Sequence, residues 1–447
     1  MGRRKRQPVR SRIGRVSIHS HHGSWWLYYR EGTQAVRRRV ADTEAEAEQI
    51  AARVNAQLAS ATPTMLTFQP ISVPELREKF LEHHEHVLRS SVGTIRRYRA
   101  ATQHLVDFAG TIPVHTISPD RFTLFLRERN VSPNGHVRTA KRKLRDKGVL
   151  YILQTCRSLY AYAIRMRHLP PYSENPFSQL RVDRMTIEDA KPIFVFDEET
   201  ELEFFRAADD WSFPIHFTLA KTGLRVGELV HLLIEELDLE NGWLHIRNKP
   251  DLGWKTKTRN ERSVPLVSEV VNVLKHVIGD RDCGPVFLRH SFQTSERQPL
   301  LCGTRTELAA VLQSRLAAAS ATPLTRDAQL RISRTIWRDA GAVKADRIRT
   351  SFIRIANQLQ WQNATCPKSW RHSFATLLQD VNVDPLIRQI TLGHKPTGAG
   401  GELGTTAVYT HTRAATQRKE IERAVRSWPE SLAMASLWLQ KHGGFSS

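Results

Sequence analysis

Two short segments each place an arginine where it can bind a phosphate. In Thr222-Gly-Leu-Arg-Val-Gly-Glu-Leu, Arg225 stands at the predicted start of a helix, beside backbone amides that can contact the same anion. Far downstream, Lys368-Ser-Trp-Arg-His-Ser-Phe-Ala-Thr places Arg371 on a second helix. For Arg225, helix capping or a salt bridge is the alternative. Either segment alone is weak evidence of a phosphate site.

Three further segments add a lysine, a histidine and a tyrosine. Lys257 lies in Trp254-Lys-Thr-Lys-Thr-Arg-Asn-Glu-Arg, between two predicted strands. Leu392-Gly-His contains His394, and Tyr409 begins Tyr-Thr-His. These residue types can donate, accept or attack in phosphoryl chemistry, but each segment taken singly is also weak evidence.

Taken in order, the five segments resemble the motif series of the tyrosine recombinase (phage integrase) family. The likeness covers about residues 190–425. It implies that Arg225 and Arg371 clamp the non-bridging oxygens of a scissile DNA phosphate. It also implies that Tyr409 is the nucleophile and forms a 3′-phosphotyrosyl linkage. Two guanidinium groups suit a transition state that builds charge on the equatorial phosphate oxygens.

The resemblance also implies roles for residues near these three. Lys257 would protonate the departing 5′ oxygen, with Lys255 or a simple phosphate contact as the alternative. His394 would donate to the phosphate or hold the tyrosine site, and Glu228 would orient or pair with basic groups. Because the phosphotyrosyl linkage keeps the bond energy of the broken phosphodiester, the family's reaction needs no cofactor and no metal ion, and we expect none.

Three departures from the family pattern leave alternatives open. Lys368 stands where the family usually has histidine; it can contact the phosphate, but a cationic lysine cannot accept the tyrosine proton unless its pKa is lowered. Residues 396–404 lengthen the connection to Tyr409, and the stretch 267–367 is longer than in compact members. The alternative functions are a catalytically impaired DNA-binding protein of the same fold and a telomere-resolving or nicking-closing enzyme.

The composition of the 447-residue chain favours a DNA partner. Its 66 Lys and Arg against 45 Asp and Glu give a formal net charge of +21, and therefore a strong positive field. With 40% hydrophobic residues the chain can form packed cores, which excludes a disordered or collagen-like protein.

Because no apolar run approaches the ~18 residues of a membrane span, and no secretory signal begins the chain, we expect a cytoplasmic protein on chromosomal or mobile-element DNA. The four cysteines lack metal-binding or disulfide spacing, and we expect ordinary thiols.

Residues 1–62 predict a basic arm-type DNA-binding module of three strands and one helix. The strands are expected over 15–19, 24–30 and 35–40, and an acidic-first helix over 42–58. The basic residues are interleaved with Trp and Tyr, a mixture that suits phosphate contact and base stacking. A basic tail with a solvated face is the alternative.

Residues 70–182 predict a helical core-binding (SAM-like) domain. Apolar residues recur there at three- and four-residue steps, and Ser118-Pro119 is typical of a helix start. We expect at least four helices between residues 72 and 170.

Residues 190–427 predict a mixed α+β catalytic domain, and residues 428–447 a C-terminal helix and tail. In the family such a helix docks on a neighbouring protomer of a cyclic tetramer; packing on its own domain is the alternative. Asn241-Gly242 is typical of a hairpin turn. The expected elements of the catalytic domain are helices over 197–208 and 213–222, a hairpin over 237–246, a third strand over 263–266 and mostly helices over 267–380.

The sequence therefore predicts a multidomain, mainly α protein with small β-sheets. The resemblance implies a site-specific DNA recombinase that integrates or excises a mobile element. Its expected partners are double-stranded DNA, three further copies of the chain in a homotetramer on paired sites, and accessory DNA-bending proteins.

Overall fold

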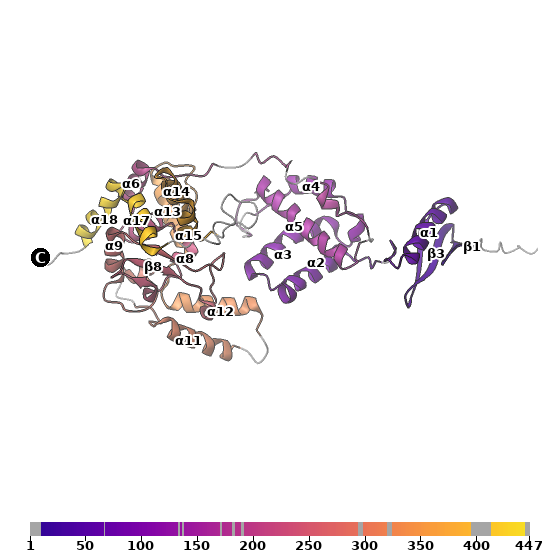
Figure 1. The fold of residues 1–447 in the computed structure, drawn as a ribbon, viewed down its shortest axis with the longest axis horizontal. Coiled ribbons are helices and arrows are strands. Elements are labelled where there is room, and N and C mark those ends of the chain that lie inside the picture. Colours follow the sequence, from indigo (N-terminus) through magenta and orange to yellow (C-terminus); the bar gives the residue numbers. More distant parts are fainter. Residues whose placement is uncertain are drawn as a thin grey trace, which may run out of the picture. The chain divides into compact units, whose positions relative to one another are not determined.

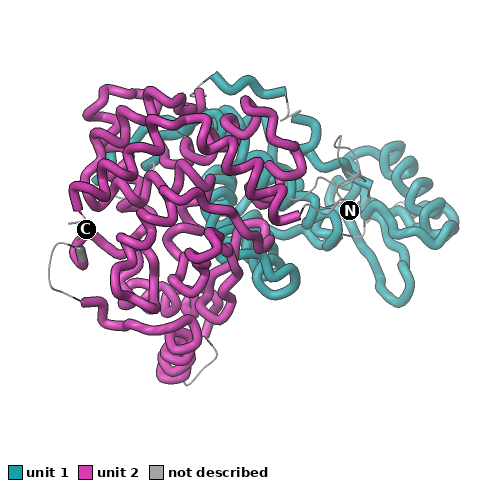
Figure 2. Tube along the Cα trace, turned by 60° about the vertical axis from the view of Figure 1, so that its left-hand side comes forward, with its two compact units in different colours: residues 1–190 teal, residues 191–447 magenta. Residues whose placement is uncertain are grey.

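The computed structural model describes most of the chain. The described residues divide into two compact units, residues 1–190 and 191–447 (Figure 2). The described residues are 10–66, 68–132, 135, 138–169, 172–180, 184–188, 192–293, 298–319, 324–394 and 413–442.

An antiparallel sheet with one covering helix opens the first unit (Figure 1). Its four described strands pair in chain order: β1 (Arg10–Ile13), β2 (Val16–His21), β3 (Ser24–Glu31) and β4 (Gln34–Ala41). The helix α1 (Glu44–Ala59) packs against this sheet. The three predicted strands and the helix are confirmed, but the prediction missed β1. The segment Arg-Ser-Arg-Ile lacks the apolar alternation that marks a strand, and an edge strand tolerates its charges.

The sheet also shows the mixture of cations and aromatic rings that its sequence indicates. The exposed guanidinium of Arg37 lies 5.5 Å from the ring centroid of Trp26. On the inner side, Val16, Ile18 and Leu27 are fully buried against α1. The module therefore has its own small core and an exposed face rich in arginine.

Helices form the rest of the first unit. The described part of residues 72–170 contains the predicted four α-helices, and Ser118 caps one of them by accepting from the backbone N–H of Arg121. Tyr160 is buried and donates to the backbone oxygen of Val114 at 3.0 Å. The helices are α2 (Val73–Glu82), α3 (Val92–Ala109), α4 (Pro119–Glu128) and α5 (Asp146–Arg165).

The second unit is built around the helix α7 (Ser212–Thr222), in which every residue is buried. It packs against α6 (Glu198–Ala207) and α14 (Lys368–Asp380). Trp370 of α14 stacks on Phe196, with ring centroids 3.8 Å apart. Both predicted helices at the start of this unit are confirmed, and the end of α7 leads directly into Gly223 and Arg225.

A three-stranded antiparallel sheet lies beside these helices. It consists of β7 (Leu237–Asp238), β8 (Trp243–Ile246) and β9 (Arg262–Pro265), in chain order. The turn between β7 and β8 contains Gly242 with φ +63°, so the predicted hairpin and third strand are confirmed. Residues 247–261 form the β8–β9 loop, which carries Lys257.

Helices dominate the rest of this unit, as the sequence indicates for residues 267–380. Two of them, α11 and α12, pack on each other and form a small second core with the β8–β9 loop. The remaining α-helices are α8 (Val226–Leu229), α9 (Ser268–Ile278), α10 (His290–Gln293), α11 (Arg305–Ala318), α12 (Arg326–Asp339), α13 (Ala345–Gln358), α15 (Pro385–Leu392), α17 (Ala414–Val425) and α18 (Pro429–His442).

The C-terminal helix α18 packs within its own unit, against α6 and α9. Leu432 and Ala435 are buried in the main core, and the buried Ser431 hydroxyl accepts from Lys221 Nζ at 2.7 Å. Within the chain itself, this helix therefore completes the core of its own unit.

All four cysteines are free thiols, as expected from their spacing, although the Sγ atoms of Cys283 and Cys302 lie 3.6 Å apart. Of the helices that the structure describes, none has the length and apolar character needed to span a bilayer.

Candidate functional site

Arg371 joins three of the sequence segments at one point. Its side chain, on the first turn of α14, donates to the backbone oxygen of Gly223 at 2.7 Å and to that of Leu392. The same guanidinium lies 3.2 Å from Nε2 of His394. Burial, together with the nearby charge of Arg225, lowers the pKa of Arg371 to about 10. The structure therefore brings Arg371, His394 and the Arg225 segment together.

Arg225 precedes the short helix α8 and is tied to Glu228. Its backbone N–H donates to one carboxylate oxygen at 2.9 Å, and its guanidinium donates to the other at 2.8 Å. The side chain keeps 23% of its surface exposed, so a guanidinium face remains open to an anion. The expected pairing of Glu228 with basic groups is confirmed.

Arg262 is a member of this cluster that the sequence analysis did not single out. From β9 it donates to both carboxylate oxygens of Glu228, at 3.0 and 2.7 Å, and to the backbone oxygen of Thr391 at 2.8 Å. Burial alone would raise the pKa of Glu228, but the hydrogen bonds and charge of Arg262, with the help of Arg225, hold it below its ordinary value. Two arginines thus share one carboxylate, and Arg371 lies near enough to feel its charge, so the cluster keeps a net positive charge for a bound anion.

Glycine is required at the point where Arg371 meets α7. Gly223 ends α7 in the left-handed conformation, with φ +61°, and a Cβ there would lie 2.4 Å from Cδ1 of the buried Phe374. Gly393, with φ +64°, would likewise place a Cβ 2.9 Å from Cδ of Arg262. The two glycines let the arginine segments approach each other.

His394 follows Gly393, the residue that caps the end of α15, and is exposed. Partial burial lowers the pKa of its imidazole, and the charges of Arg371 and Arg225 lower it further. Arginine can only donate, so the neutral ring accepts from Arg371 with Nε2 and carries its proton on Nδ1. His394 therefore offers a donor on one side and, on the other, a lone pair that Arg371 occupies.

The lysines of the β8–β9 loop differ in their environment. Lys255 and Lys257 are both exposed, and Lys257 lies in a turn. Thr258, the next residue, donates to the backbone oxygen of Gly393 at 3.4 Å, which fastens this turn beside His394. Lys249 is buried and pairs with Glu236 at 2.7 Å, so it serves the fold.

Lys368 is the exposed first residue of α14, one helical turn before Arg371. Burial, and then the charges of Lys368 and Arg371, lower the pKa of His372. Lys368 therefore adds to the positive field at this end of the helix.

Tyr409 lies outside the described residues, as do 395–412 around it. The chain is described again from Arg413, and Gln417 of α17 donates to the backbone oxygen of Ser263 at 3.2 Å and to Thr391 Oγ1 at 3.1 Å. A cavity of about 770 Å³ lies between β8, β9, the end of α15 and the start of α17. Its lining includes His394, Arg262, Ala414 and Gln417.

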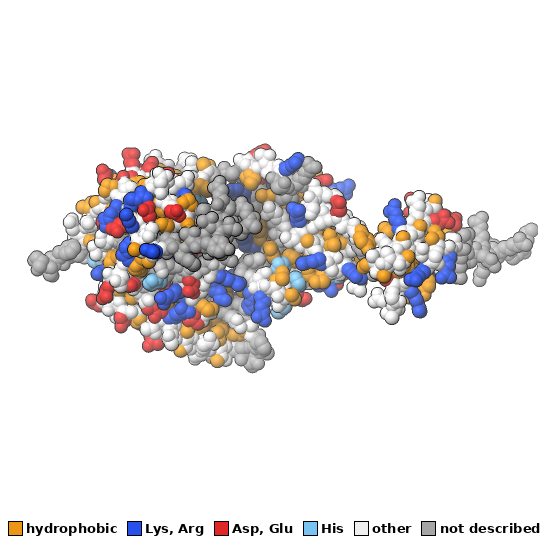
Figure 3. Space-filling model, viewed as in Figure 1, with side chains coloured by type: hydrophobic (Ala, Val, Ile, Leu, Met, Phe, Trp, Pro, Cys, Tyr) orange, Lys and Arg blue, Asp and Glu red, His pale blue; other side chains and the backbone are white. Residues whose placement is uncertain are grey.

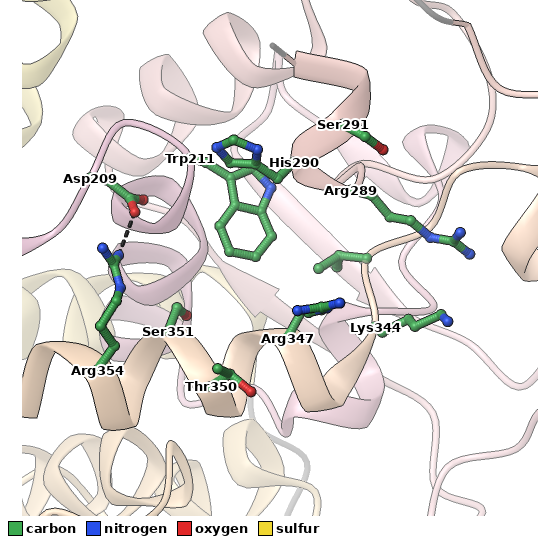
Figure 4. Close-up of a pocket in the computed structure, with 11 residues that line it drawn as sticks. Asp209, Trp211, Arg289, His290, Ser291, Lys344, Arg347, Thr350, Ser351 and Arg354 are labelled. Carbon is green, nitrogen blue, oxygen red and sulfur yellow. Dashed lines mark hydrogen bonds and ion pairs between the residues drawn. The ribbon is translucent and has the colours of Figure 1, made fainter. Parts of the chain in front are cut away.

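Another cavity, of about 470 Å³, lies between the start of α7, α10 and α13 (Figure 4). In this view Arg289 and Lys344 extend to the right, Arg347 lies below Trp211, and Arg354 pairs with Asp209 on the left. The predicted site residues are not among its described lining. Across the described part of the chain, no three or more His, Cys, Asp or Glu side chains are placed to share a metal ion.

Known proteins share this sequence pattern. The profile of the phage integrase family matches residues 206–416. The tyrosine recombinase XerD of Staphylococcus aureus (strain Mu50) is 25% identical over 287 residues, which cover 61% of this chain and 74% of that protein. The tyrosine recombinase XerA of Pyrococcus furiosus is 25% identical over 203 residues, which cover 45% of this chain and 51% of that protein.

The fold is shared as well. A solved structure of a Tn1549 transposon integrase fragment, in complex with a circular intermediate DNA, superposes with a TM-score of 0.51. It is 17% identical, and the alignment covers 79% of this chain and 99% of that chain. The multidomain, mainly helical architecture with small sheets is thus confirmed. Residues 206–416 therefore match the phage integrase family in sequence, and the fold shared with the transposon integrase is consistent with that match.

Proposed function

We propose that this protein is a site-specific recombinase that cleaves and rejoins double-stranded DNA through a 3′-phosphotyrosyl linkage to Tyr409. The supporting observation is the position of Arg371, which is bonded to Gly223 and Leu392 and lies against His394. Arg225 is near enough to lower the pKa of Arg371, so two like charges adjoin. A phosphate between them would relieve their repulsion, and both can donate to its non-bridging oxygens.

The proposed reaction assigns one task to each group. The Tyr409 oxygen attacks phosphorus, the bond from phosphorus to the 5′ oxygen breaks, and Lys257 gives its proton to that oxygen. When Arg371 turns to the phosphate, Nε2 of the neutral His394 becomes free to take the tyrosine proton. Lys368 adds positive charge near the phosphate. Attack by the freed 5′ hydroxyl on the phosphotyrosine reverses these steps and reseals the strand.

The surface is consistent with DNA as the partner. Lys and Arg side chains are spread over the visible face of both units (Figure 3). Their phosphate contacts would supply sequence-independent affinity that falls as salt rises. We propose that a homotetramer on paired sites, helped by accessory DNA-bending proteins, uses this chemistry to integrate or excise a mobile element.

The test is covalent capture on a nicked substrate. The full chain is incubated, in EDTA, with nicked duplexes made from the DNA that flanks its own gene, and an SDS-resistant adduct is mapped by mass spectrometry. We expect an adduct on Tyr409 and none with Tyr409→Phe. Tight binding without an adduct would overturn the proposal in favour of a binding-only protein. Hairpin-ended products without strand exchange would instead indicate a telomere-resolving enzyme.

A further inference from the structure

We propose that the helix pair α11–α12 braces the β8–β9 loop and thereby positions Lys257 for proton transfer to the 5′ oxygen. This inference rests on the proposed function, which gives Lys257 its task. It assigns a role to the long stretch between β9 and α14, and it makes Arg305 and Ser333 positioning residues.

An apolar core joins the helix pair to the loop. Leu252 of the loop is fully buried, and it packs in one cluster with Leu308 and Leu312 of α11 and with Ile336 and Trp337 of α12. The loop thus contributes a side chain to the core of the helix pair. Because this burial removes the leucine side chain from water, it holds the loop against the helix pair.

Hydrogen bonds also join the loop backbone to α12. The backbone oxygen of Leu252 accepts from the buried Ser333 hydroxyl at 2.5 Å and from Trp337 Nε1 at 3.2 Å. The adjacent Gly253 has φ +70°, and a Cβ there would lie 2.2 Å from Ser333 Oγ. This close approach of α12 to the loop backbone therefore requires glycine at position 253.

A bidentate ion pair fixes the other side of the loop. Arg305, at the start of α11, donates from Nε to Asp251 at 2.8 Å and from its terminal nitrogen at 2.6 Å. Both side chains are about two-thirds buried, with 31% and 34% of their surfaces exposed. A planar guanidinium held at two points restricts rotation as well as distance.

The braced part of the loop is continuous with the part that carries Lys257. Lys249 and Trp254 exchange backbone hydrogen bonds of 2.9 Å, which closes the braced end. Just outside it, the Asn248 side chain accepts from the Thr256 N–H at 2.8 Å and donates to the backbone oxygen of Arg259 at 3.0 Å. Asn248 therefore closes the turn around Lys257 and joins it to the end that α11 and α12 hold.

The test compares two bridging atoms at the scissile phosphate. A substrate with sulfur in place of the 5′ bridging oxygen releases a thiolate, whose conjugate acid has a pKa of about 8.5 in the case of cysteine, so this leaving group needs no proton donor. Cleavage of this substrate does not depend on where Lys257 stands. A misplaced lysine is therefore distinguished from a damaged fold by the ratio of the two cleavage rates.

We expect Arg305→Ala to cleave the oxygen-bridged nicked duplex roughly tenfold to a hundredfold more slowly, because small displacements of a reacting group have effects of this size. It should cleave the sulfur-bridged duplex at the wild-type rate. Ser333→Ala should show the same pattern more weakly, and Lys257→Met more strongly. Arg331→Ala is the matched control, because the exposed Arg331 pairs with Asp327 at 3.6 Å within α12 alone. It should cleave both substrates normally.

The outcomes separate the two proposals. If the wild-type protein forms no adduct with either substrate, the proposed function fails. If the wild type reacts and Arg305→Ala matches it on the oxygen-bridged duplex, the brace is wrong while the function stands. Equal slowing of Arg305→Ala on both substrates would also overturn the brace, since it indicates general damage. Normal oxygen-bridged cleavage by Lys257→Met would overturn the role of Lys257.

Discussion

Arg371 donates a 2.7 Å hydrogen bond to the backbone oxygen of Gly223, although the two residues are 148 positions apart in the chain. This bond connects the first turn of α14 to the end of α7. The arginine is 8% exposed, and in the proposed function a phosphate contacts this exposed part. One side chain therefore holds the site together and is available to the substrate.

Arg371→Lys is expected to abolish cleavage with little effect on duplex binding. A single ammonium cannot replace a planar fork that reaches Gly223, Leu392 and a phosphate oxygen at once. Loss of one preorganised donor to a developing oxyanion typically costs ~10²–10³ in rate. The measurements are the rate of adduct formation and the Kd from mobility shifts on one nicked duplex. The matched control is Arg347→Lys, in the separate cavity. If duplex binding weakens by the same factor as cleavage, the assignment of Arg371 to the scissile phosphate is contradicted.

Gly223→Ala is expected to destabilise the second unit more than Gly284→Ala does. Both glycines have positive φ, +61° and +87°, and alanine pays about 1–2 kcal/mol in such a conformation. Only at position 223 does the new Cβ meet another side chain, the buried Phe374. This overpacking adds about 1–3 kcal/mol. Scanning calorimetry of the full chain measures the difference, and equal shifts for the two variants would show that the contact with Phe374 is unimportant.

His394 is expected to titrate below the ordinary histidine pKa of about 6.5. Burial disfavours its charged form, and the charges of Arg371 and Arg225 add to that effect. Arg225→Ala should raise the midpoint because it removes one neighbouring cation, whereas Arg347→Ala should not. NMR of the protein with labelled histidine measures the midpoint, and a His394→Gln variant identifies the resonance. A midpoint at or above the ordinary value would contradict the partial burial and the neighbouring cations that the structure gives to His394.

Local sequence patterns predicted the helices and strands of this fold better than the contacts between residues that lie far apart in the chain. The caps, apolar periodicity and Asn241-Gly242 turn are signals within a few residues, and the helices and hairpin that they predict are present. The edge strand β1 was missed because solvent, not a core, surrounds much of it. The motif order indicated Arg225, Arg371 and His394, and the structure brings these together.

Arg262 shows why the rest of the site was not predicted. It lies in the quoted lysine segment, but its partners Glu228 and Thr391 are 34 and 129 positions away. No local periodicity indicates such a pairing. The same holds for the brace, because the contact of Arg305 with Asp251 depends on how α11 returns to the β8–β9 loop. The available signal was Glu228 itself, because the resemblance implies that it pairs with basic groups.

The buried His216 is expected to make the second unit sensitive to acid. Its ring accepts from Trp370 Nε1 at 3.1 Å and donates to Ser351 Oγ at 3.0 Å, a pattern that only the neutral form satisfies. Burial lowers its pKa to about 3, with Asp209 opposing this and Arg354 adding to it. In the unfolded chain the same ring takes its proton near pH ~6.5. Between these values the unfolded state binds more protons, so stability is lost as pH falls from about 6.5.

The contribution of His216 to that loss is about 1.4 kcal/mol per pH unit, on the acid side of the unfolded pKa. His216→Gln removes the titrating group but keeps one donor and one acceptor, so its unfolding midpoint should fall less steeply between about pH 7 and pH 5. The control is His86→Gln, since His86 is exposed in the first unit. Calorimetry of the full chain over this range supplies the slopes. If the wild type and His216→Gln lose stability in parallel as the pH falls, His216 binds as many protons in the folded protein as in the unfolded chain. The assignment of a neutral, buried His216 is then wrong.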